Sequence, residues 1–311
     1  MAQDRRDLPR GVPAIRVALD TTPLLQTRAG TARYVRALRD HLDVEEVSFP
    51  ATSRVRTAYA DLVWYPRLRV DADVLHCPTF RGPFKARNKV VVTVHDLAVL
   101  KHPEWFNRWT ATYSRIAVPR VLHAASRVIA VSEFTKRELA AYGVDATVIP
   151  NAVEDVFTPD GPRADGDYVL AVGTLEPRKN LERIAEAVEG ELRVVGARGW
   201  GGVDPPKHVT WLGDVPDDEL ARLYRGARCL VYASLYEGFG IPVAEALACG
   251  CPVVTSRDSP MAELAPEAAL VDPYDVASIR SGIARATSVT RRGPSWADVA
   301  AMTRAVYEEL A

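Results

Sequence analysis

Short apolar runs alternate with amphipathic segments along the whole chain. Mainly apolar runs rich in β-branched residues predict strands at 15–19, 73–76, 89–94, 127–132, 168–172, 192–195, 208–212, 229–233 and 252–256. Helical periodicity predicts helices at 31–42, 135–142, 181–188, 217–224 and 296–310. Two of these helices carry capping-box pairs, Thr135 with Glu138 and Ser295 with Asp298. Because strands alternate with helices, the pattern predicts two α/β domains with mainly parallel sheets.

Turn-forming residues indicate where the two domains meet. The stretch Pro159–Gly166 is rich in Pro, Gly and Asp and precedes a fresh strand. We predict an N-terminal Rossmann-like domain over 1–160 and a C-terminal one over 161–290. A C-terminal helix over 291–311 follows, and packing against the N-terminal domain is one option for it. A chain of 311 residues with 48% hydrophobic content is long enough for two cores.

The most informative segment is Glu237–Gly250, which carries two carboxylates eight residues apart around a Gly-Phe-Gly-Ile-Pro turn. Apolar strands precede and follow it, so the unit is strand, loop, helix, strand. Pro242 fits a first-turn helix position. This reading places Glu237 in the loop and Glu245 in the first helical turn.

This helix start is suited to an anion. Ile241 has no side-chain oxygen that could cap the helix, so the first N–H groups can face a phosphate. Glu237 and Glu245 can accept hydrogen bonds from vicinal sugar hydroxyls, and Gly238 and Gly240 permit close backbone approach. Phosphate and hydroxyls together indicate a nucleotide sugar. The alternative is an ordinary helix start whose acidic residues are favoured by the macrodipole.

A basic pair, Arg178 and Lys179, lies between the strand 168–172 and a helix that opens near Asn180. A guanidinium and an ammonium beside helix N–H groups can clamp a diphosphate. A solvated basic pair is the alternative. Cations at a helix start oppose the macrodipole, which favours ligand binding.

These segments resemble a known family. GTLEPRKN and LYEGFGIPVAEALACGCPVVTS are similar to the C-terminal domain of the retaining GT-B-fold glycosyltransferases of the family 4 type, a large bacterial family with many mannosyltransferases. The N-terminal half agrees through ALDTTPLLQTRAGTARYVRAL, VVVTVHDLAVLKHPE, SEFTKRELAAYGV and VIPNAVEDVF. The resemblance spans most of residues 15–290 and implies two Rossmann-like domains that face each other across a cleft.

The resemblance implies a role for each matching residue. Glu245 would hold the ribose hydroxyls, and Glu237 would hold the hydroxyls of the donor sugar. Arg178 and Lys179 would bind the diphosphate, and His95 would contact the donor sugar from across the cleft. The candidate catalytic residues are therefore His95, Glu237, Arg178 and Lys179. Further donor contacts, mainly by backbone, are implied for Gly30, Gly238, Phe239 and Gly240.

Two positions need separate weighing. Many relatives place an Arg directly after the glycine that ends the strand, where this chain has Thr174. Arg178 is the candidate for the missing positive charge. The His95-Asp96 pair is also compatible with a simple strand end and turn. Its place favours function, because ligands gather beyond the carboxyl ends of parallel strands, where Gly30, Lys179 and Glu237 are also expected.

Family resemblance implies that the anomeric configuration is retained. No carboxylate is convincingly placed as a nucleophile, so we expect front-face attack with the departing phosphate accepting the acceptor's proton. Two fixed cations and helix N–H groups can stabilise the leaving diphosphate, so we expect no metal and no other cofactor. The GTLEPRKN and GTARYV forms are most similar to those of mannosyltransferases, so the resemblance implies GDP-mannose as donor and a glycan, glycolipid or small molecule as acceptor. A nucleotide-sugar epimerase of the same fold and an inactive sugar-nucleotide-binding protein are the alternatives.

Charge is unevenly distributed between the halves. Residues 1–160 carry 23 Lys and Arg against 18 Asp and Glu, and the rest carries 16 against 22. The basic segments 81–89 and 104–109 can meet an anionic lipid or a lipid-linked acceptor, although ordinary solvated loops are the simpler interpretation. The chain has no strongly basic face and no recognition motif, so nucleic acid is not an expected partner.

The remaining composition indicates a reduced, cytoplasmic protein, with peripheral contact to the inner face of the membrane as an option. Residues 1–14 lack the apolar core of a signal peptide, and no apolar run reaches about 18 residues. The four cysteines offer no disulfide framework and no zinc spacing, and the last three are expected in the core: Cys77, Cys229, Cys249 and Cys251. Asp71 and Asp73 precede a strand and are interpreted as a strand-entry turn rather than a metal site.

Overall fold

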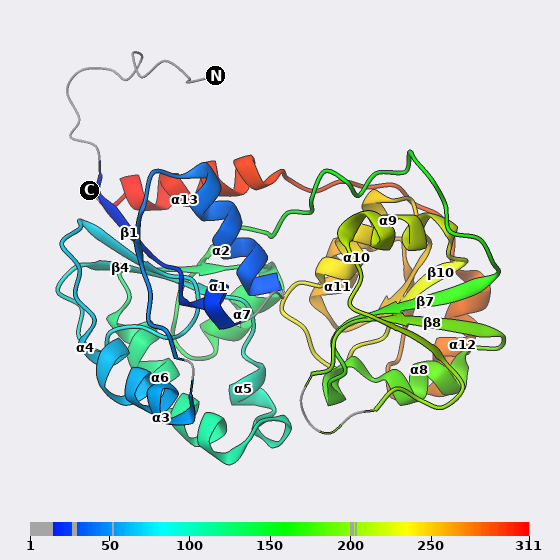
Figure 1. Ribbon diagram of the computed structural model, residues 1–311, viewed down its shortest axis with the longest axis horizontal. Coiled ribbons are helices and arrows are strands. Elements are labelled where there is room, and N and C mark those ends of the chain that lie inside the picture. The colour runs from blue at the N-terminus through cyan, green and yellow to red at the C-terminus, as the bar shows by residue number, and fades with distance from the viewer. Residues whose placement is uncertain (1–14, 27–29, 52, 200–201, 203, 311) are drawn as a thin grey trace, which may run out of the picture.

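Two α/β halves lie side by side in the computed structural model, which describes the chain except for residues 1–14, 27–29, 52, 200–201, 203 and 311 (Figure 1). Each half is built on a six-stranded sheet in which every recorded strand pair is parallel. This confirms the predicted GT-B arrangement of two Rossmann-like sheets. The N-terminal residues 1–14 and the loop residues 27–29 before Gly30, both used in the sequence interpretation, lie outside the described residues.

The first sheet has the strand order β2-β1-β3-β4-β5-β6. Its strands are β1 (Val17–Asp20), β2 (Glu45–Val47), β3 (Val74–Cys77), β4 (Lys89–Val94), β5 (Arg127–Ala130) and β6 (Thr147–Val148). The second sheet has the order β12-β11-β10-β7-β8-β9. Its strands are β7 (Tyr168–Val172), β8 (Glu191–Val195), β9 (Thr210–Gly213), β10 (Cys229–Tyr232), β11 (Val253–Ser256) and β12 (Ala269–Val271). Strands buried on both faces, such as β4 and β10, are apolar runs because helices cover both sides of the sheet.

Helices form the outer layers of both halves. The first half contains α1 (Thr22–Gln26), α2 (Gly30–His41), α3 (Arg54–Tyr59), a π-helical turn (Ala60–Trp64), α4 (Tyr65–Arg67), α5 (Ala98–Lys101), a 3₁₀ turn (Pro103–Trp105), α6 (Arg108–Ala124) and α7 (Glu133–Ala140). The second contains a 3₁₀ turn (Pro177–Lys179), α8 (Leu181–Ala187), α9 (Asp217–Gly226), α10 (Ile241–Ala248), α11 (Pro260–Leu264) and α12 (Val276–Arg285). No helix in the described part of the chain is long and apolar enough to cross a bilayer.

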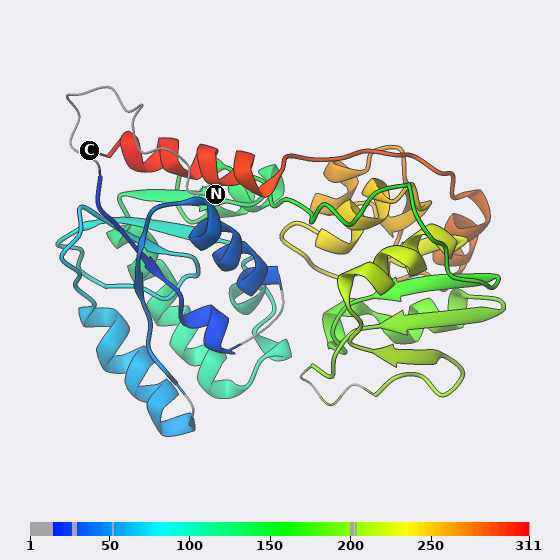
Figure 2. The ribbon, with the colours of Figure 1, turned by 45° about the horizontal axis from the view of Figure 1, so that its top comes forward.

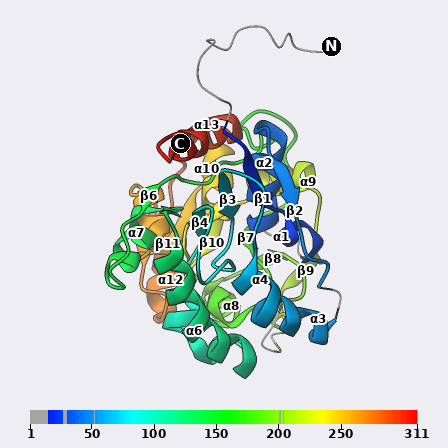
Figure 3. The same cartoon turned by 90° about the vertical axis from the view of Figure 1, so that its left-hand side faces the viewer.

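The last helix, α13 (Trp296–Glu308), returns from the second half to the first. It lies along α2, and Figures 2 and 3 show both on one side of the first sheet, with α6 on the other. Trp296 and Tyr307 are buried in the same apolar cluster as Leu19 and Tyr34. The chain therefore crosses between the halves twice, once in the segment that joins β6 to β7 and once before α13 (Figure 1).

Several local predictions change in detail. The Ser295–Asp298 capping box is confirmed, whereas the Thr135–Glu138 box is wrong. The side chain of Ser132 caps α7 by accepting from the Thr135 N–H at 3.0 Å, so this helix begins two residues earlier than predicted. The first strand starts at Val17 and β9 starts at Thr210, each two residues later than the apolar pattern suggests.

Three smaller interpretations concern residues outside the site. The stretch Pro159–Gly166 forms no helix or strand, and the Arg225 side chain on α9 donates to the Pro162 carbonyl at 2.7 Å. Asp73 accepts from the Arg16 N–H at 2.9 Å as β3 begins, which confirms a strand-entry turn there. The four cysteines are free and buried.

Candidate active site

A buried ion-pair cluster lies beyond the carboxyl ends of β7 and β10. Glu237 follows β10, and its Oε1 accepts from Lys179 Nζ at 2.5 Å and from the Tyr232 hydroxyl at 3.0 Å. Its Oε2 accepts from Arg178 Nη1 at 2.7 Å. The structure thus brings together three of the predicted catalytic residues, although Glu237 lies nearly sixty positions after the adjacent Arg178 and Lys179. Tyr232, which sequence reasoning missed, binds both Lys179, at 2.6 Å, and Glu237.

The two cations reach Glu237 because of the backbone that carries them. Arg178 and Lys179 lie in a 3₁₀ turn before α8, rather than in the first turn of that helix. Asn180 then takes a left-handed conformation with φ 58°, which ends the turn and starts α8. Its side-chain amide donates to the carbonyls of Ala233 at 3.0 Å and Pro273 at 2.7 Å, which anchors the turn to the ends of β10 and β12.

The charges in this cluster are balanced. Burial alone would raise the pKa of Glu237, but Arg178 and Lys179 lower it to about 2. A second buried carboxylate, Glu176, accepts from Arg178 Nε at 2.7 Å and pairs with the hydroxyl of Thr174. Thr174, the residue that departs from the family pattern, and Arg178 therefore both donate hydrogen bonds to the carboxylate of Glu176. Sequence reasoning treated the basic pair as a free cationic clamp and missed Glu176.

The glycine loop after Glu237 packs directly against the N-terminal half. A Cβ on Gly238 would lie 1.6 Å from the His95 carbonyl oxygen, so only glycine fits at this contact. The Gly238 carbonyl accepts from the Ser132 hydroxyl at 2.6 Å and from that of Thr135 at 3.2 Å. Gly240 has φ 96°, and a Cβ there would lie 2.4 Å from Met261 Cγ. Both glycines permit close packing within the protein, and Phe239 between them is buried.

The helix α10 begins at Ile241 with Pro242 in its first turn, as predicted. The sequence interpretation took Ile241 as the cap position, but the N-cap residue is Gly240 and Ile241 is the first helical residue. The helix start nevertheless has no side-chain cap, as expected. Glu245 is the fifth helical residue, one position beyond the first turn to which the sequence assigned it. Gly30 opens α2 opposite this point, and a Cβ on Gly30 would lie 2.8 Å from Ile241 Cδ1. The N-termini of α10 and α2 therefore converge. The sequence interpretation placed Gly30 directly beyond a strand end, but α1 lies between β1 and Gly30.

Glu245 has a different environment from Glu237. It is buried, its Oε1 accepts from Arg33 Nη1 at 2.7 Å, and its Oε2 accepts from the Tyr224 hydroxyl at 2.9 Å. Burial raises the pKa of Glu245 to about 7, because the nearby Arg33 and Tyr224 offset only part of the desolvation. Arg33 also pairs with Asp217 at the start of α9. Sequence reasoning missed Arg33, Tyr224 and Asp217.

His95 follows β4 and lies at the contact between the two halves. Its Nε2 lies 3.1 Å from the Pro78 carbonyl oxygen, so this nitrogen carries the proton and Nδ1 is the acceptor. Burial lowers the pKa of His95, which keeps the ring neutral at pH 7. Tyr34 packs edge-on against the ring, with 5.1 Å between centroids. Asp96 accepts from the Ala98 N–H at 3.0 Å. Of the His95-Asp96 pair, Asp96 therefore stabilises the turn that follows β4.

Other contacts hold the halves together beside this cluster. The Tyr236 hydroxyl accepts from the Leu97 N–H at 3.2 Å and pairs with Glu138 on α7. Arg137, also on α7, pairs with Glu263 on α11. Glu237 and its neighbours therefore lie where the strand ends of both sheets meet.

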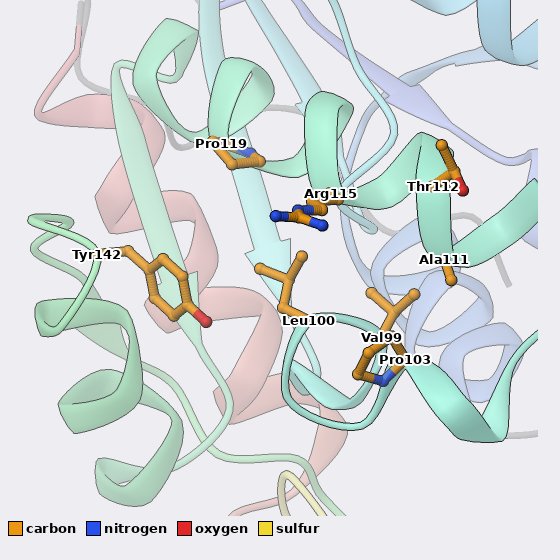
Figure 4. A pocket seen from close by; sticks show the side chains of 8 residues that line it. All are labelled: Val99, Leu100, Pro103, Ala111, Thr112, Arg115, Pro119 and Tyr142. Carbon is orange, nitrogen blue, oxygen red and sulfur yellow. The ribbon is translucent and has the colours of Figure 1, made fainter. Parts of the chain in front are cut away.

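Two cavities are described, one beside the Glu237 cluster and one in the first half. One of about 230 Å³ lies beyond β10, β11 and β12, and its lining includes Glu237, Ser256, Asp272 and Phe134. A larger cavity of about 470 Å³ lies in the first half between α5, α6 and the end of α7. Figure 4 shows the side chains around it: Val99, Leu100, Pro103, Ala111, Thr112, Arg115, Pro119 and Tyr142. Its walls are mainly apolar, with Arg115 between them.

Comparisons with known proteins agree for both halves. Residues 16–179 match the family model described as Glycosyltransferase Family 4, and residues 202–291 match Glycosyl transferases group 1. The chain is 31% identical to the O-antigen chain mannosyltransferase B of Escherichia coli, covering 73% of this chain and 67% of that protein. It is 30% identical to the O-antigen chain mannosyltransferase RfbU of Salmonella typhimurium, covering 75% and 71%. Its fold is similar to that of Anabaena HepE in complex with UDP and glucose, with a TM-score of 0.66 at 16% identity over 94% of this chain and 99% of that one.

Proposed function

The chain belongs to glycosyltransferase family 4 and is a glycosyltransferase, and on this premise we propose that it transfers mannose from GDP-mannose with retention of configuration. The mannosyl donor is supported by the two O-antigen mannosyltransferases, at 31% and 30% identity. The acceptor is a glycan, a glycolipid or a small molecule. The observation that carries the proposal is the Glu237 cluster, which lies where the strand ends of both sheets meet, opposite a neutral His95.

In this proposal the donor diphosphate binds beside the uncapped start of α10. The charges of Arg178 and Lys179 are already balanced by Glu237 and Glu176, so the site offers directed hydrogen-bond donors rather than a net positive field. Lys179 uses two of its three N–H donors on Tyr232 and Glu237, counted among the described residues. The third donor and the convergent N-termini of α10 and α2 are the groups that can contact the phosphates.

The transferred sugar then lies between Glu237 and His95. Glu237 stays ionised at any pH near neutrality because its pKa is about 2, and it accepts from sugar hydroxyls. The Nδ1 atom of His95 accepts from a further hydroxyl from the opposite half. Transfer breaks the bond between the anomeric carbon and the phosphate oxygen, and the acceptor oxygen bonds to the same face of that carbon. The acceptor's proton passes to the departing phosphate, so no protein base is required.

The acceptor binds on the side of the first half. The cavity between α5, α6 and α7 combines apolar walls with one guanidinium, Arg115 (Figure 4). It adjoins the basic and aromatic segment 104–109, in which the Trp109 side chain is exposed. An apolar cavity with one cation suits a lipid-linked acceptor that carries a phosphate. The same cavity and the exposed Trp109 support peripheral contact with an anionic membrane.

A donor panel tests the proposal directly. The purified protein is incubated with GDP-mannose, UDP-glucose and other nucleotide sugars, and free nucleoside diphosphate is measured with and without a mannoside acceptor. We expect release with GDP-mannose that rises in the presence of acceptor, and nuclear magnetic resonance of the first product should show retained configuration. An inverted linkage, or an epimerised sugar that stays attached to its nucleotide, would overturn the proposed reaction.

A further inference from the structure

Arg33 links the two halves of the molecule at the candidate nucleotide site. It is the fourth residue of α2, in the first half, and its guanidinium reaches two helices of the second half. Nη1 donates to Glu245 on α10 at 2.7 Å, and Nη2 pairs with Asp217 at the start of α9. A cation in the first turn of a helix opposes the macrodipole, so these two carboxylates account for its position.

The hydrogen bonds of Glu245 within the described residues leave two of its lone-pair sites unused. A carboxylate has about four lone-pair sites, two on each oxygen. Arg33 occupies one site on Oε1 and Tyr224 one site on Oε2. One site on each oxygen is therefore unused, and a carboxylate with one free site on each oxygen can accept from two neighbouring hydroxyls. The Glu245 side chain is only 3% exposed, so this orientation is fixed by its partners.

We propose that Arg33 is the positioning residue of the nucleotide site: it favours the ionised form of Glu245 and orients this carboxylate so that its two remaining lone pairs accept the ribose hydroxyls. The proposal rests on the proposed function for the identity of the ligand, and on the geometry alone for the coupling of Arg33 to Glu245. It also explains how a residue of the first half controls a ribose contact in the second.

The charges around Glu245 predict the direction in which its pKa changes when Arg33 or Asp217 is replaced. Burial raises the pKa of Glu245, Arg33 and Tyr224 lower it, and Asp217 raises it, for a value of about 7. Glu154, in the segment between β6 and β7, also faces Arg33, and Cys249, the C-cap residue of α10, lies near Glu245. Removing Arg33 therefore raises the pKa of Glu245, whereas neutralising Asp217 lowers it. A purely structural role would not move the two variants in opposite directions.

The first arm of the test uses the ligand-free protein. Carbon-13 resonance of the side-chain carboxyl groups, assigned with Glu245→Gln, gives the titration midpoint of Glu245 in wild type, Arg33→Gln and Asp217→Asn. We expect the midpoint to rise by about one to three pH units in Arg33→Gln and to fall in Asp217→Asn. Arg36→Gln, an exposed arginine on the same helix, is the matched control and should leave it unchanged. An unmoved midpoint in Arg33→Gln, or shifts of the same sign in both variants, overturns the proposal.

The second arm uses GDP-mannose, whose diphosphate keeps a constant charge between about pH 5.5 and 8.5, so that any pH dependence reports on the protein. Wild-type affinity should rise as pH increases through about 7. In Arg33→Gln it should be weaker by roughly tenfold at neutral pH and recover only at higher pH. Arg33→Lys, which keeps the charge and guards against a variant that fails to fold, should restore part of the wild-type profile. If wild type binds GDP-mannose and Arg33→Gln keeps its affinity and pH profile, the role of Arg33 is overturned while the proposed function stands. If wild type binds no nucleotide sugar, both are overturned.

Discussion

Two glutamates eight residues apart have opposite electrostatic settings in this structure. Glu237 accepts from two cations and one hydroxyl, and these partners hold its pKa at about 2. Glu245 accepts from one hydroxyl and one cation, Arg33, which it shares with Asp217, and its pKa rises to about 7. Both side chains are almost fully buried. Burial is thus common to both, and the supply of cations decides which carboxylate stays ionised.

The difference also separates their capacity for ligands. Glu237 has three of its roughly four lone-pair sites occupied, whereas Glu245 has two. Glu237 is therefore part of the framework that fixes Arg178 and Lys179, with one site left for a sugar hydroxyl. Glu245 keeps a site on each oxygen. In the proposed function this corresponds to one carboxylate that organises the transfer site and one that binds the nucleoside.

The largest expected effect comes from Glu237→Ala. This change leaves Arg178 and Lys179 buried without their shared carboxylate, and breaking a buried pair from one side costs about 3–5 kcal/mol. Urea denaturation should therefore show a free energy of unfolding lower by about that amount. Glu245→Ala should cost less, because Arg33 keeps Asp217 as a partner. Equal losses in the two variants would contradict the difference between the two settings.

The next effect is a pH dependence of stability with opposite sign for the two residues. The pKa of Glu245 is raised from 4.5 to about 7 in the folded state, so its contribution is present at low pH and is lost as pH rises through that window. The loss amounts to about 3 kcal/mol. The pKa of Glu237 is lowered to about 2, so its contribution is present above about 4.5 and is lost as pH falls.

Unfolding free energies of wild type, Glu245→Gln and Glu237→Gln from pH 3.5 to 8 check both signs. The difference between wild type and Glu245→Gln should change between about pH 4.5 and 7. The difference between wild type and Glu237→Gln should change only below about 4.5. A flat difference for Glu245→Gln would mean that the pKa of this carboxylate is the same in the folded and the unfolded state.

The smallest expected effect is that of metal removal. If Arg178, Lys179 and the start of α10 supply the groups that bind the departing diphosphate, turnover should be unchanged after treatment with EDTA. The measurement is nucleotide release with the chelator present and after added magnesium or manganese. Loss of turnover that either ion restores would assign the diphosphate to a metal and return the Glu237 cluster to a purely structural role.

Much of the fold could be predicted from the sequence because its signals are local. Apolar strands such as 89–94 and 168–172 have the predicted limits, since a strand buried on both faces is apolar throughout. The wrong predictions concern the ends of helices and strands, and at a helix start a single capping side chain decides which residue is the first of the helix. Ser132 rather than Thr135 caps α7, and no apolar pattern distinguishes the two.

The site could be predicted only in part, because its partners come from distant segments. The cationic pair and Glu237 are visible as motifs, but the contact between them depends on the turn at Asn180. Glu176 and Tyr232 carry no motif of their own. Arg33 did carry a signal, a cation in the first turn of a predicted helix, which is the same signal that drew attention to Arg178. Its partners on α9 and α10 require the packing of the two halves.

In the proposed function, Glu245 binds the nucleotide and Glu237 serves the transfer step. Calorimetric titration with GDP and turnover measurement on Glu245→Gln and Glu237→Gln, at about pH 8 where both wild-type carboxylates are ionised, test it most directly. We predict that Glu245→Gln weakens GDP binding by about 10- to 100-fold, since a charged hydrogen-bond partner contributes roughly 1.5–3 kcal/mol. Glu237→Gln should leave GDP affinity nearly unchanged and lower the turnover number, because its contacts are to the group that moves. Equal loss of GDP affinity in both variants would contradict the claim.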